Sequence, residues 1–244
     1  MQQLATGLIA PLRNVVNFDS LVRRLLATKP NLPRIGVMYG PSGLGKTWSA
    51  TFAANEHEAR HIQVGFSWTQ RYFCKAVMIE VGLIKPDENP KGSIPDMISM
   101  IAKQLASSGN ILIVDDAQNL DRKGMLGIIT ELYESCQSPL ILAGEEKLPK
   151  ILQREERLHN RVLAWVEALP ANLADCKALA RLVCEDVEVG VDLLEDVCKA
   201  VGGCARRIVT NLDNIREFAS GRGLNFIDAA AYTDRIHTGN HKDV

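Results

Sequence analysis

The stretch from Gly40 to Thr47 constrains this chain more than any other part of it, because it reads Gly-Pro-Ser-Gly-Leu-Gly-Lys-Thr. This is the G-x-x-x-x-G-K-T pattern of a phosphate-binding loop, or P-loop. An apolar run at residues 35–39 precedes the loop, and a helix-compatible run at residues 48–58 follows it. The pattern therefore has the strand–loop–helix context that it requires. We expect successive backbone N–H groups and the N-terminus of the following helix to surround a phosphate group.

The side chains of the loop add chemistry to this cradle. Its glycines can adopt positive φ and leave room for an anion. Lys46 is expected to reach the β- and γ-phosphates of a nucleotide, and Thr47 is expected to ligate Mg²⁺. The alternative is a glycine-rich turn with an exposed lysine, which the flanking strand and helix disfavour. The predicted nucleotide-binding residues of the loop are Gly40, Pro41, Ser42, Gly43, Leu44, Gly45, Lys46 and Thr47.

Composition narrows the class of protein. The chain has 244 residues, of which 46% are hydrophobic and 23% charged, as expected for a soluble globular protein with one large domain or a main domain and a companion. Its net charge of −1 excludes a globally basic nucleic-acid binder, so any nucleic-acid surface would be a local patch. The six cysteines form no C-x-x-C pair, which predicts a reducing, intracellular setting without a structural metal. Because no signal peptide or membrane-spanning run is recognisable, we expect a cytoplasmic protein.

Apolar runs alternate with helical patterns over the first two thirds of the chain. This alternation predicts an α/β fold, with a parallel sheet flanked by helices. Strands are expected near residues 34–39, 60–66, 111–114, 139–143 and 162–168. Helices are expected near residues 18–26, 48–58, 70–82, 94–107, 121–136 and 147–156. Asp19 or Ser20 would cap the first of these helices.

The pattern changes after Pro170, where only helical periodicity is found. The expected helices are at residues 172–187, 191–201, 204–220 and 226–232. We therefore predict an α/β nucleotide-binding core at residues 1–169, including a lead-in at 1–33. A small all-α domain at residues 170–232 and a polar tail at 233–244 follow it.

Two adjacent carboxylates complete the predicted nucleotide site. The buried run Ile111-Leu-Ile-Val114 leads into Asp115 and Asp116. Asp115 is expected to hold Mg²⁺, directly or through water, because this cation prefers oxygen ligands. Asp116 would orient or deprotonate the attacking water. The alternative is that both residues cap the following helix.

Arginines are the remaining candidates for the site. Arg157 and Arg161 lie just before the last expected strand of the core, and Arg206 lies at the start of a helix in the second domain. A cation placed on the γ-phosphate accelerates phosphoryl transfer, and a neighbouring subunit often supplies it. The alternative for each arginine is an ordinary solvated surface position.

Taken together, these motifs resemble those of AAA+ ATPases over roughly residues 8–232. Within that superfamily, the chain is most similar to the transposition ATPases, the group of the phage Mu B protein and its TniB- and TnsC-like relatives. The resemblance is carried by Arg13-Asn-Val-Val16, Val37-Met-Tyr-Gly-Pro-Ser-Gly-Leu-Gly-Lys-Thr47, Asp115-Asp-Ala-Gln-Asn-Leu120, Leu140-Ile-Leu-Ala-Gly144 and Gly202-Gly-Cys-Ala-Arg-Arg207.

The resemblance implies roles for residues and partners. Arg161 matches the arginine finger that acts across a subunit interface, and Arg206 matches the sensor 2 arginine of the helical lid. Proteins of this group bind ATP with Mg²⁺ and assemble as rings or helical filaments on double-stranded DNA. They recruit or activate a DDE-type transposase, and ATP hydrolysis releases them. If the chain is encoded by a phage, its setting is the host cytoplasm.

Three features of the chain depart from the pattern of that group. The second carboxylate is Asp116 where glutamate is usual, so we expect weak turnover. The sensor 1 position after the fourth strand is commonly Asn or Thr, but Glu145 and Glu146 occupy this region, and an acid beside a phosphate is unfavourable. The phage Mu B protein carries an N-terminal helix-turn-helix domain, whereas the lead-in of about 33 residues is expected to be too short for such a domain and a linker. We therefore expect any bound DNA to contact the core.

The resemblance also places the DNA contacts in the region after the second strand. Arg71 and Lys75, followed by Lys85 and Lys91, would contact phosphates without reading bases. The alternative is that Arg71 and Lys75 form the polar face of an ordinary amphipathic helix. Trp68 is expected in the core.

Three classes of function remain. The leading one is an ATP-dependent, sequence-nonspecific DNA-binding assembly factor for transposition. The second is another AAA+ nucleic-acid factor, such as a helicase, a clamp loader or a replication initiator. The third is a small-molecule kinase or another metabolic P-loop enzyme, a class in which a helical lid with this arginine is rare.

Overall fold

The computed structural model of this chain describes residues 12–122 and 124–239. The outer parts of the predicted lead-in and tail, residues 1–11 and 240–244, lie outside the described residues. Backbone contacts divide the chain into two compact units. The larger unit comprises Asn17–Pro41 and Lys46–Glu167. Of the described residues, the smaller unit comprises 12–16, Ser42–Gly45 and 168–239.

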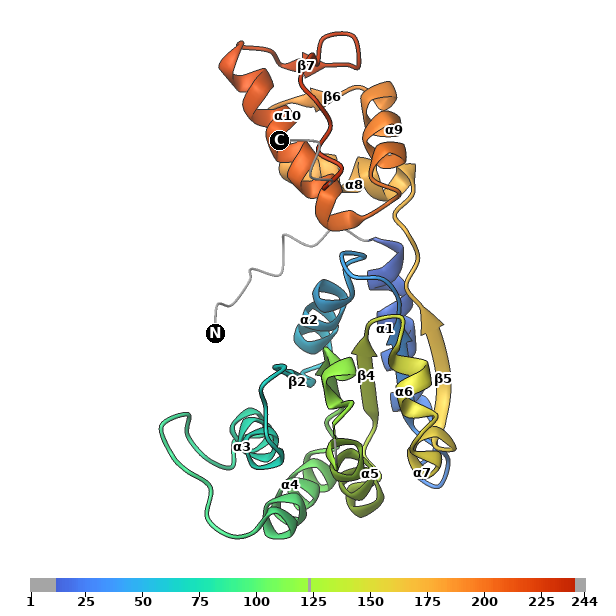
Figure 1. The fold of residues 1–244 in the computed structure, drawn as a ribbon, viewed down its shortest axis with the longest axis vertical. Coiled ribbons are helices and arrows are strands. Elements are labelled where there is room, and N and C mark those ends of the chain that lie inside the picture. The colour runs from blue at the N-terminus through green and yellow to red at the C-terminus, as the bar shows by residue number, and fades with distance from the viewer. Residues whose placement is uncertain (1–11, 123, 240–244) are drawn as a thin grey trace. The chain divides into compact units, whose positions relative to one another are not determined.

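The larger unit is built on a five-stranded sheet with the order β2-β3-β4-β1-β5 (Figure 1). Its strands are β1 (Ile35–Tyr39), β2 (Arg60–Gln63), β3 (Leu112–Asp115), β4 (Leu140–Gly144) and β5 (Val162–Glu167). Each neighbouring pair is parallel. The predicted α/β fold with a parallel sheet is therefore confirmed. Strand β1 lies between β4 and β5, and the P-loop begins directly after β1.

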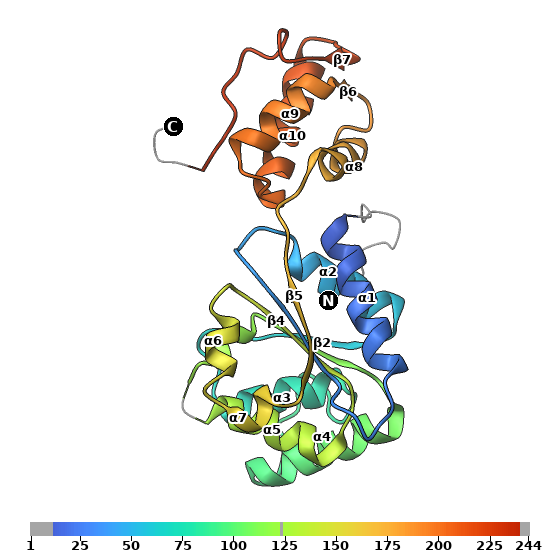
Figure 2. The ribbon, with the colours of Figure 1, turned by 90° about the vertical axis from the view of Figure 1, so that its right-hand side faces the viewer.

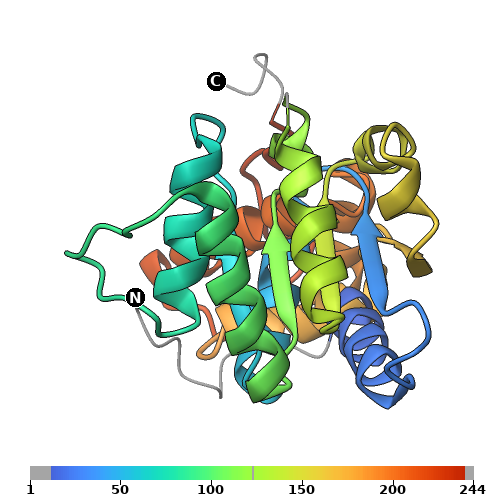
Figure 3. The same ribbon diagram turned by 90° about the horizontal axis from the view of Figure 1, so that it is seen from below.

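Helices cover both faces of this sheet. On one face lie α1 (Arg13–Ala27) and α2 (Lys46–Glu56), and on the other lie α3 (Gln70–Glu80), α4 (Ile94–Ser108) and α5 (Met125–Cys136) (Figures 2 and 3). A Cβ on Gly36 of β1 would come within 2.9 Å of Leu21 in α1, so this strand and helix pack closely. Three shorter helices complete the unit: η1 (Ala117–Leu120), α6 (Leu148–Leu152) and α7 (Glu156–His159).

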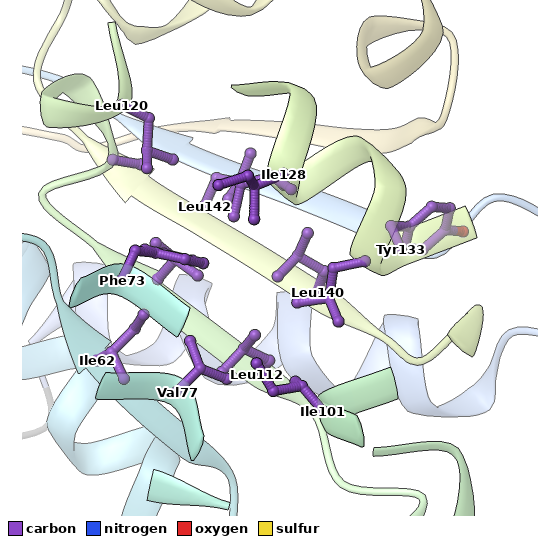
Figure 4. Close-up of a cluster of buried hydrophobic side chains, with 14 of the residues drawn as sticks. Ile62, Phe73, Val77, Ile101, Leu112, Leu120, Ile128, Tyr133, Leu140 and Leu142 are labelled. Carbon is purple, nitrogen blue, oxygen red and sulfur yellow. The ribbon is translucent and has the colours of Figure 1, made fainter. Parts of the chain in front are cut away.

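The main core lies between the sheet and α3, α4 and α5 (Figure 4). Phe73 and Val77 of α3 and Ile101 of α4 meet Leu112 of β3 and Leu142 of β4, and all five side chains are buried. Along β3 and β4, the residues that alternate with Leu112 and Leu142 face the helical layer on the opposite side of the sheet, and they are buried too. Burial on both faces explains why the strands read as continuous apolar runs.

Two predicted helices of this unit differ most from the structure, whereas the others have ends within a few residues of the predicted ones. Helix α1 begins at Arg13, so the predicted start and cap at Asp19 or Ser20 are wrong. Asp19 lies inside the helix, where its carboxylate accepts hydrogen bonds from Arg23 and the His57 ring. The helix predicted at 147–156 is broken into α6 and α7.

The smaller unit contains α8 (Leu173–Val183), α9 (Val191–Ala200) and α10 (Ala205–Gly221), packed around their own apolar core. The helix predicted at 226–232 is wrong. Phe226–Ile227 form β7, which pairs in parallel with β6 (Glu188–Val189) (Figure 2). The reason is tertiary: the N–H of Gly190 donates to the Ile227 carbonyl at 2.7 Å, and the Ile227 side chain is fully buried. None of the described helices is long and apolar enough to cross a membrane.

Candidate functional site: the P-loop and the carboxylates of β3

The P-loop follows β1, and Lys46 is the first residue of α2. The Lys46 ammonium donates to the carbonyls of Gly40 and Pro41, both at 2.8 Å. Burial lowers the pKa of Lys46, and the nearby carboxylates of Asp115 and Glu145 oppose that shift. The predicted phosphate-binding lysine is thus a largely buried cation that is held by its own loop. Phosphate oxygens are stronger partners for an ammonium group than neutral carbonyls are.

The tip of the loop, Ser42–Gly45, groups with the smaller unit. Gly43 has φ +85, and a Cβ on it would lie 2.6 Å from the Cys204 sulfur, so both backbone conformation and space require glycine there. The N–H of Arg206 donates to the Gly43 carbonyl at 3.0 Å. The predicted lid arginine therefore lies beside the loop tip. The contact of Cys204 with the loop had no signal in the sequence.

Asp115, at the end of β3, is 1% exposed. One of its oxygens, Oδ1, accepts from the N–H of Asp116 at 2.9 Å. Within the described residues, the other oxygen, Oδ2, has no hydrogen-bond partner although it is buried. Burial raises the pKa of Asp115, and the Thr47 hydroxyl beside the carboxylate opposes the rise. The two predicted metal ligands are thus brought together.

This arrangement fits Mg²⁺. A buried carboxylate oxygen without a partner and a threonine hydroxyl next to it are hard oxygen ligands, and Mg²⁺ is commonly held by few protein ligands together with water and substrate phosphates. When bound there, the ion would neutralise developing charge on the phosphates. Nowhere in the described residues, this site included, do three His, Cys, Asp or Glu side chains gather as a metal site, so Mg²⁺ would depend on phosphate oxygens and water for its remaining ligands.

The substitution Asp115→Asn should stabilise the nucleotide-free protein. The folded-state pKa of Asp115 is raised, so at neutral pH the ionised form opposes folding, and this cost is absent at pH values below the unfolded pKa. We expect the neutral amide to raise Tm by a few degrees, equivalent to about 1 kcal/mol. Thermal unfolding with and without Mg-ATP measures both effects, because the variant should lose the additional stabilisation by Mg-ATP. A lower Tm without ligand would contradict this account.

Asp116 is held in a different way. Its backbone has φ 51 and ψ 38, a left-handed conformation that is uncommon for residues other than glycine. It precedes η1, but its side chain makes no capping hydrogen bond to the described backbone, so the capping alternative does not apply. Instead, Oδ2 accepts from Gln63 at 2.8 Å and Oδ1 accepts from Gln118 at 3.1 Å. Neither glutamine was a predicted site residue.

The predicted arginine finger is engaged within its own chain. Arg161 Nη2 lies 2.7 Å from Glu134 Oε1, and Arg157 pairs with the other oxygen of the same carboxylate. Arg161 also donates to the carbonyl of Arg157. The Arg161 side chain is 35% exposed. Because ion pairs of this exposure contribute little stability, the guanidinium can be released at a low cost.

The predicted DNA-contacting side chains hold a loop. Arg71 donates to the carbonyls of Pro90 and Gly92, at 2.7 and 2.9 Å, and Lys75 donates to the Asn89 side chain at 2.9 Å. Their contacts orient the loop that carries the exposed residues Lys85 and Lys91. The ring of Trp68 is half-buried and packs edge-on against Tyr72, with ring centroids 4.9 Å apart. Nearby, the Arg122 guanidinium lies 4.2 Å from the ring centre of the exposed Phe66.

Several solved structures share this fold. The Aeropyrum pernix ORC1 protein in complex with DNA has a TM-score of 0.64 and 18% identity, over 91% of this chain and 64% of that one. The Aeropyrum pernix ORC2 protein has a TM-score of 0.68 and 14% identity, and the match covers 91% of this chain and 67% of that one. The Thermotoga maritima RuvB Holliday junction branch migration motor has a TM-score of 0.59 and 18% identity, and the match covers 93% of this chain and 65% of that one. At these identities, the likeness shows the P-loop AAA+ fold and nothing more specific.

Among curated proteins, the chain is 26% identical over 250 residues to the ATP-dependent zinc metalloprotease FtsH of Acidothermus cellulolyticus. The match covers 97% of this chain but 36% of that protein, so the chain spans about a third of its length. Residues 57–61 read His-Glu-Ala-Arg-His, the H-E-x-x-H pattern that binds zinc when both histidines lie on one helix. Here α2 ends at Glu56, Glu58 has φ 50 and β2 begins at Arg60, so the helix is absent from this described segment.

One family model matches as well. It is described as an AAA domain and matches residues 29–152, which is just over half of the 244-residue chain. The match includes the P-loop, Asp115 and Asp116, the residues that form the geometry described above. By sequence and by fold, this chain belongs to the AAA domain family.

Proposed function

We propose that this chain binds and hydrolyses ATP with Mg²⁺, and that the nucleotide state controls its assembly on double-stranded DNA. The observation that carries the proposal is the grouping of Thr47, Asp115 and Asp116 at the carboxyl ends of parallel strands, where α/β sheets bind ligands. In the reaction, the oxygen of water forms a bond to the γ-phosphorus while the bond from that phosphorus to the ADP oxygen breaks. The water proton passes to Asp116 or to solvent. The products are ADP and inorganic phosphate.

The chain's residues divide this work between them. Lys46 exchanges its loop carbonyls for phosphate oxygens, and the N–H groups of the P-loop surround the phosphates. Asp116 orients the attacking water. Its carboxylate is one methylene shorter than the glutamate that is usual at this position, which supports slow turnover. We infer a switch-like ATPase rather than a fast motor.

The proposed partners are duplex DNA, further copies of this chain and a DDE-type transposase, in the cytoplasm of the cell or of a phage host. Support for DNA comes from the exposed lysines at 85 and 91, which Arg71 and Lys75 hold in place through the loop contacts. Contacts of this kind with phosphates are sequence-independent and sensitive to salt. Support for a transposition role is the resemblance in motifs described above.

A second candidate is another nucleic-acid factor of the same superfamily. It is favoured by likeness in fold to an ORC1 protein bound to DNA and to a branch migration motor. A motor requires rapid turnover coupled to strand separation or migration. The assembly switch is favoured instead by the short Asp116 side chain, which supports slow turnover, and by the ion pair that holds Arg161 within its own chain.

Electron microscopy of negatively stained samples tests the proposal. The full chain is imaged with ATP, with ADP and without nucleotide, each in the presence and absence of duplex DNA. We expect rings or filaments on DNA in the presence of ATP, but not with ADP or without nucleotide. Monomers under all six conditions would overturn the assembly role, and fast DNA-stimulated ATPase with strand separation would favour the second candidate.

A further inference from the structure

The side chain of Gln118 links the ends of two strands. Gln118 lies in η1, directly after β3. Its Nε2 donates to Asp116 Oδ1 at 3.1 Å, and its Oε1 accepts from the N–H of Glu145 at 3.1 Å. One amide group therefore connects the second carboxylate after β3 to the first residue after β4.

The end of β4 is shaped to admit this amide. A Cβ on Gly144 would lie 2.6 Å from Gln118 Oε1 and 3.2 Å from the Gln118 backbone nitrogen. Any larger residue at position 144 would displace the glutamine. Since Gly144 is not among the glycines with positive φ, space rather than backbone conformation explains the glycine.

The link continues to the P-loop. The N–H of Gly40, the first residue of the loop, donates to the Gly144 carbonyl at 3.3 Å. A continuous set of contacts thus runs from Asp116 through Gln118 and the end of β4 to the start of the phosphate-binding loop. From Gln118 onward the link uses only an amide and backbone groups, which matters because the carboxylates of Glu145 and Glu146 would repel a phosphate.

Asp116 depends on this support. Its second oxygen accepts from Gln63 at 2.8 Å, so two amide groups from β2 and η1 fix the plane of the carboxylate. The left-handed backbone of Asp116 is a strained conformation that persists only where surrounding contacts hold it. Gln118 is the contact that also reaches β4.

We propose that Gln118 is a positioning residue for ATP hydrolysis, which holds Asp116 toward the attacking water and couples its orientation to the P-loop through the end of β4. The inference rests on the ATPase activity proposed above. An uncharged polar side chain is common at the sensor 1 position after β4, where this chain has Glu145 and Glu146. The inference assigns that role to Gln118 in η1. Because the side-chain amide of Gln118 contacts Asp116 and the N–H of Glu145, we expect Gln118 to act on the rate through Asp116 and not on nucleotide affinity.

Four variants of the full chain separate the parts of this link. Gln118→Ala removes both contacts, whereas Gln118→Glu keeps an acceptor for the Glu145 N–H and loses the donor to Asp116. Asp116→Asn, alone and combined with Gln118→Ala, shows whether the glutamine acts through the carboxylate. Gln153→Ala, at an exposed glutamine, is the matched control.

We expect Gln118→Ala and Gln118→Glu to lower the single-turnover rate about 10- to 100-fold, as misplacement of a catalytic group does. The Kd for Mg-ADP should stay within about threefold of the wild-type value, which separates positioning from binding. The double variant should be no slower than Asp116→Asn. A Gln118→Ala rate equal to wild type, or effects that multiply in the double variant, would overturn the inference.

Hydrogen exchange reads the link independently of turnover. Exchange of the Glu145 amide should accelerate in Gln118→Ala and stay protected in Gln118→Glu, because only the former lacks the acceptor. If the wild-type chain binds ATP without hydrolysing it, the ATPase proposal fails and the rate role of Gln118 fails with it. If the wild-type chain hydrolyses ATP, and Gln118→Ala hydrolyses it at the same rate with unchanged exchange of the Glu145 amide, the ATPase proposal stands and only the inference about Gln118 is wrong.

Discussion

Lys46→Ala should abolish detectable binding of Mg-ATP and, with it, assembly on DNA. Lys46 is 8% exposed, and its ammonium lies 2.8 Å from the carbonyls of Gly40 and Pro41. Removing one partner of a buried charged pair typically costs about 2–5 kcal/mol, so we expect affinity to fall about 30-fold or more. Titration calorimetry with ATP and ADP measures the loss.

The variant should remain folded. Burial lowers the pKa of Lys46, so the charged form is disfavoured in the folded protein, and removing it relieves that cost while two carbonyls lose a donor. We expect the Tm without nucleotide to change by only a few degrees. Lys103→Ala, at an exposed position of α4, is the matched control. ATP affinity of Lys46→Ala close to wild type would remove the P-loop from the proposed mechanism.

Arg161→Ala should slow ATP hydrolysis by the assembled protein about 10³-fold, the lower range for loss of an arginine finger. Nucleotide affinity of the isolated chain should be unchanged, since the finger acts on a neighbouring subunit. Glu134 keeps its pairing with Arg157 in this variant, so the fold should not suffer. The measurement is the rate per active site as a function of protein concentration.

Mixing experiments decide whether the arginine acts in trans. Arg161→Ala binds ATP through an intact P-loop, and Lys46→Ala, which does not assemble by itself, carries an intact finger that can complete the site of an ATP-bound Arg161→Ala subunit. A mixture of the two should therefore regain activity that neither variant has. Arg154→Ala is the matched control, because Arg154 forms an exposed ion pair with Asp121 in the same region. An unchanged rate for Arg161→Ala, or a mixture that stays inactive while the control is active, would show that the finger role is wrong.

The pairing of Arg161 with Glu134 adds a condition to this prediction. In the structure, the guanidinium makes a 2.7 Å contact with a carboxylate of its own chain. The finger must leave that carboxylate before it can reach a neighbour. Assembly on DNA can supply the required free energy, because partly exposed ion pairs are weak.

The sequence by itself determined the features that local patterns encode. A P-loop is a set of residue types at fixed spacing, so Gly40 to Thr47 could be located without the structure. The strands ending at Asp115 and Gly144 were recognisable because strands covered on both faces are apolar throughout. Helical periodicity likewise located most of the helices, including those of the smaller unit.

Only the tertiary structure decided the contacts between distant parts of the chain. Gln63 and Gln118 are ordinary polar residues until the strand order places the ends of β2, β3 and β4 side by side, where both amides reach Asp116. The pairing of Arg161 with Glu134 has no local signal for the same reason, and β7 forms because its backbone pairs with β6. Local periodicity reports which face of an element is buried, whereas these contacts depend on which elements become neighbours.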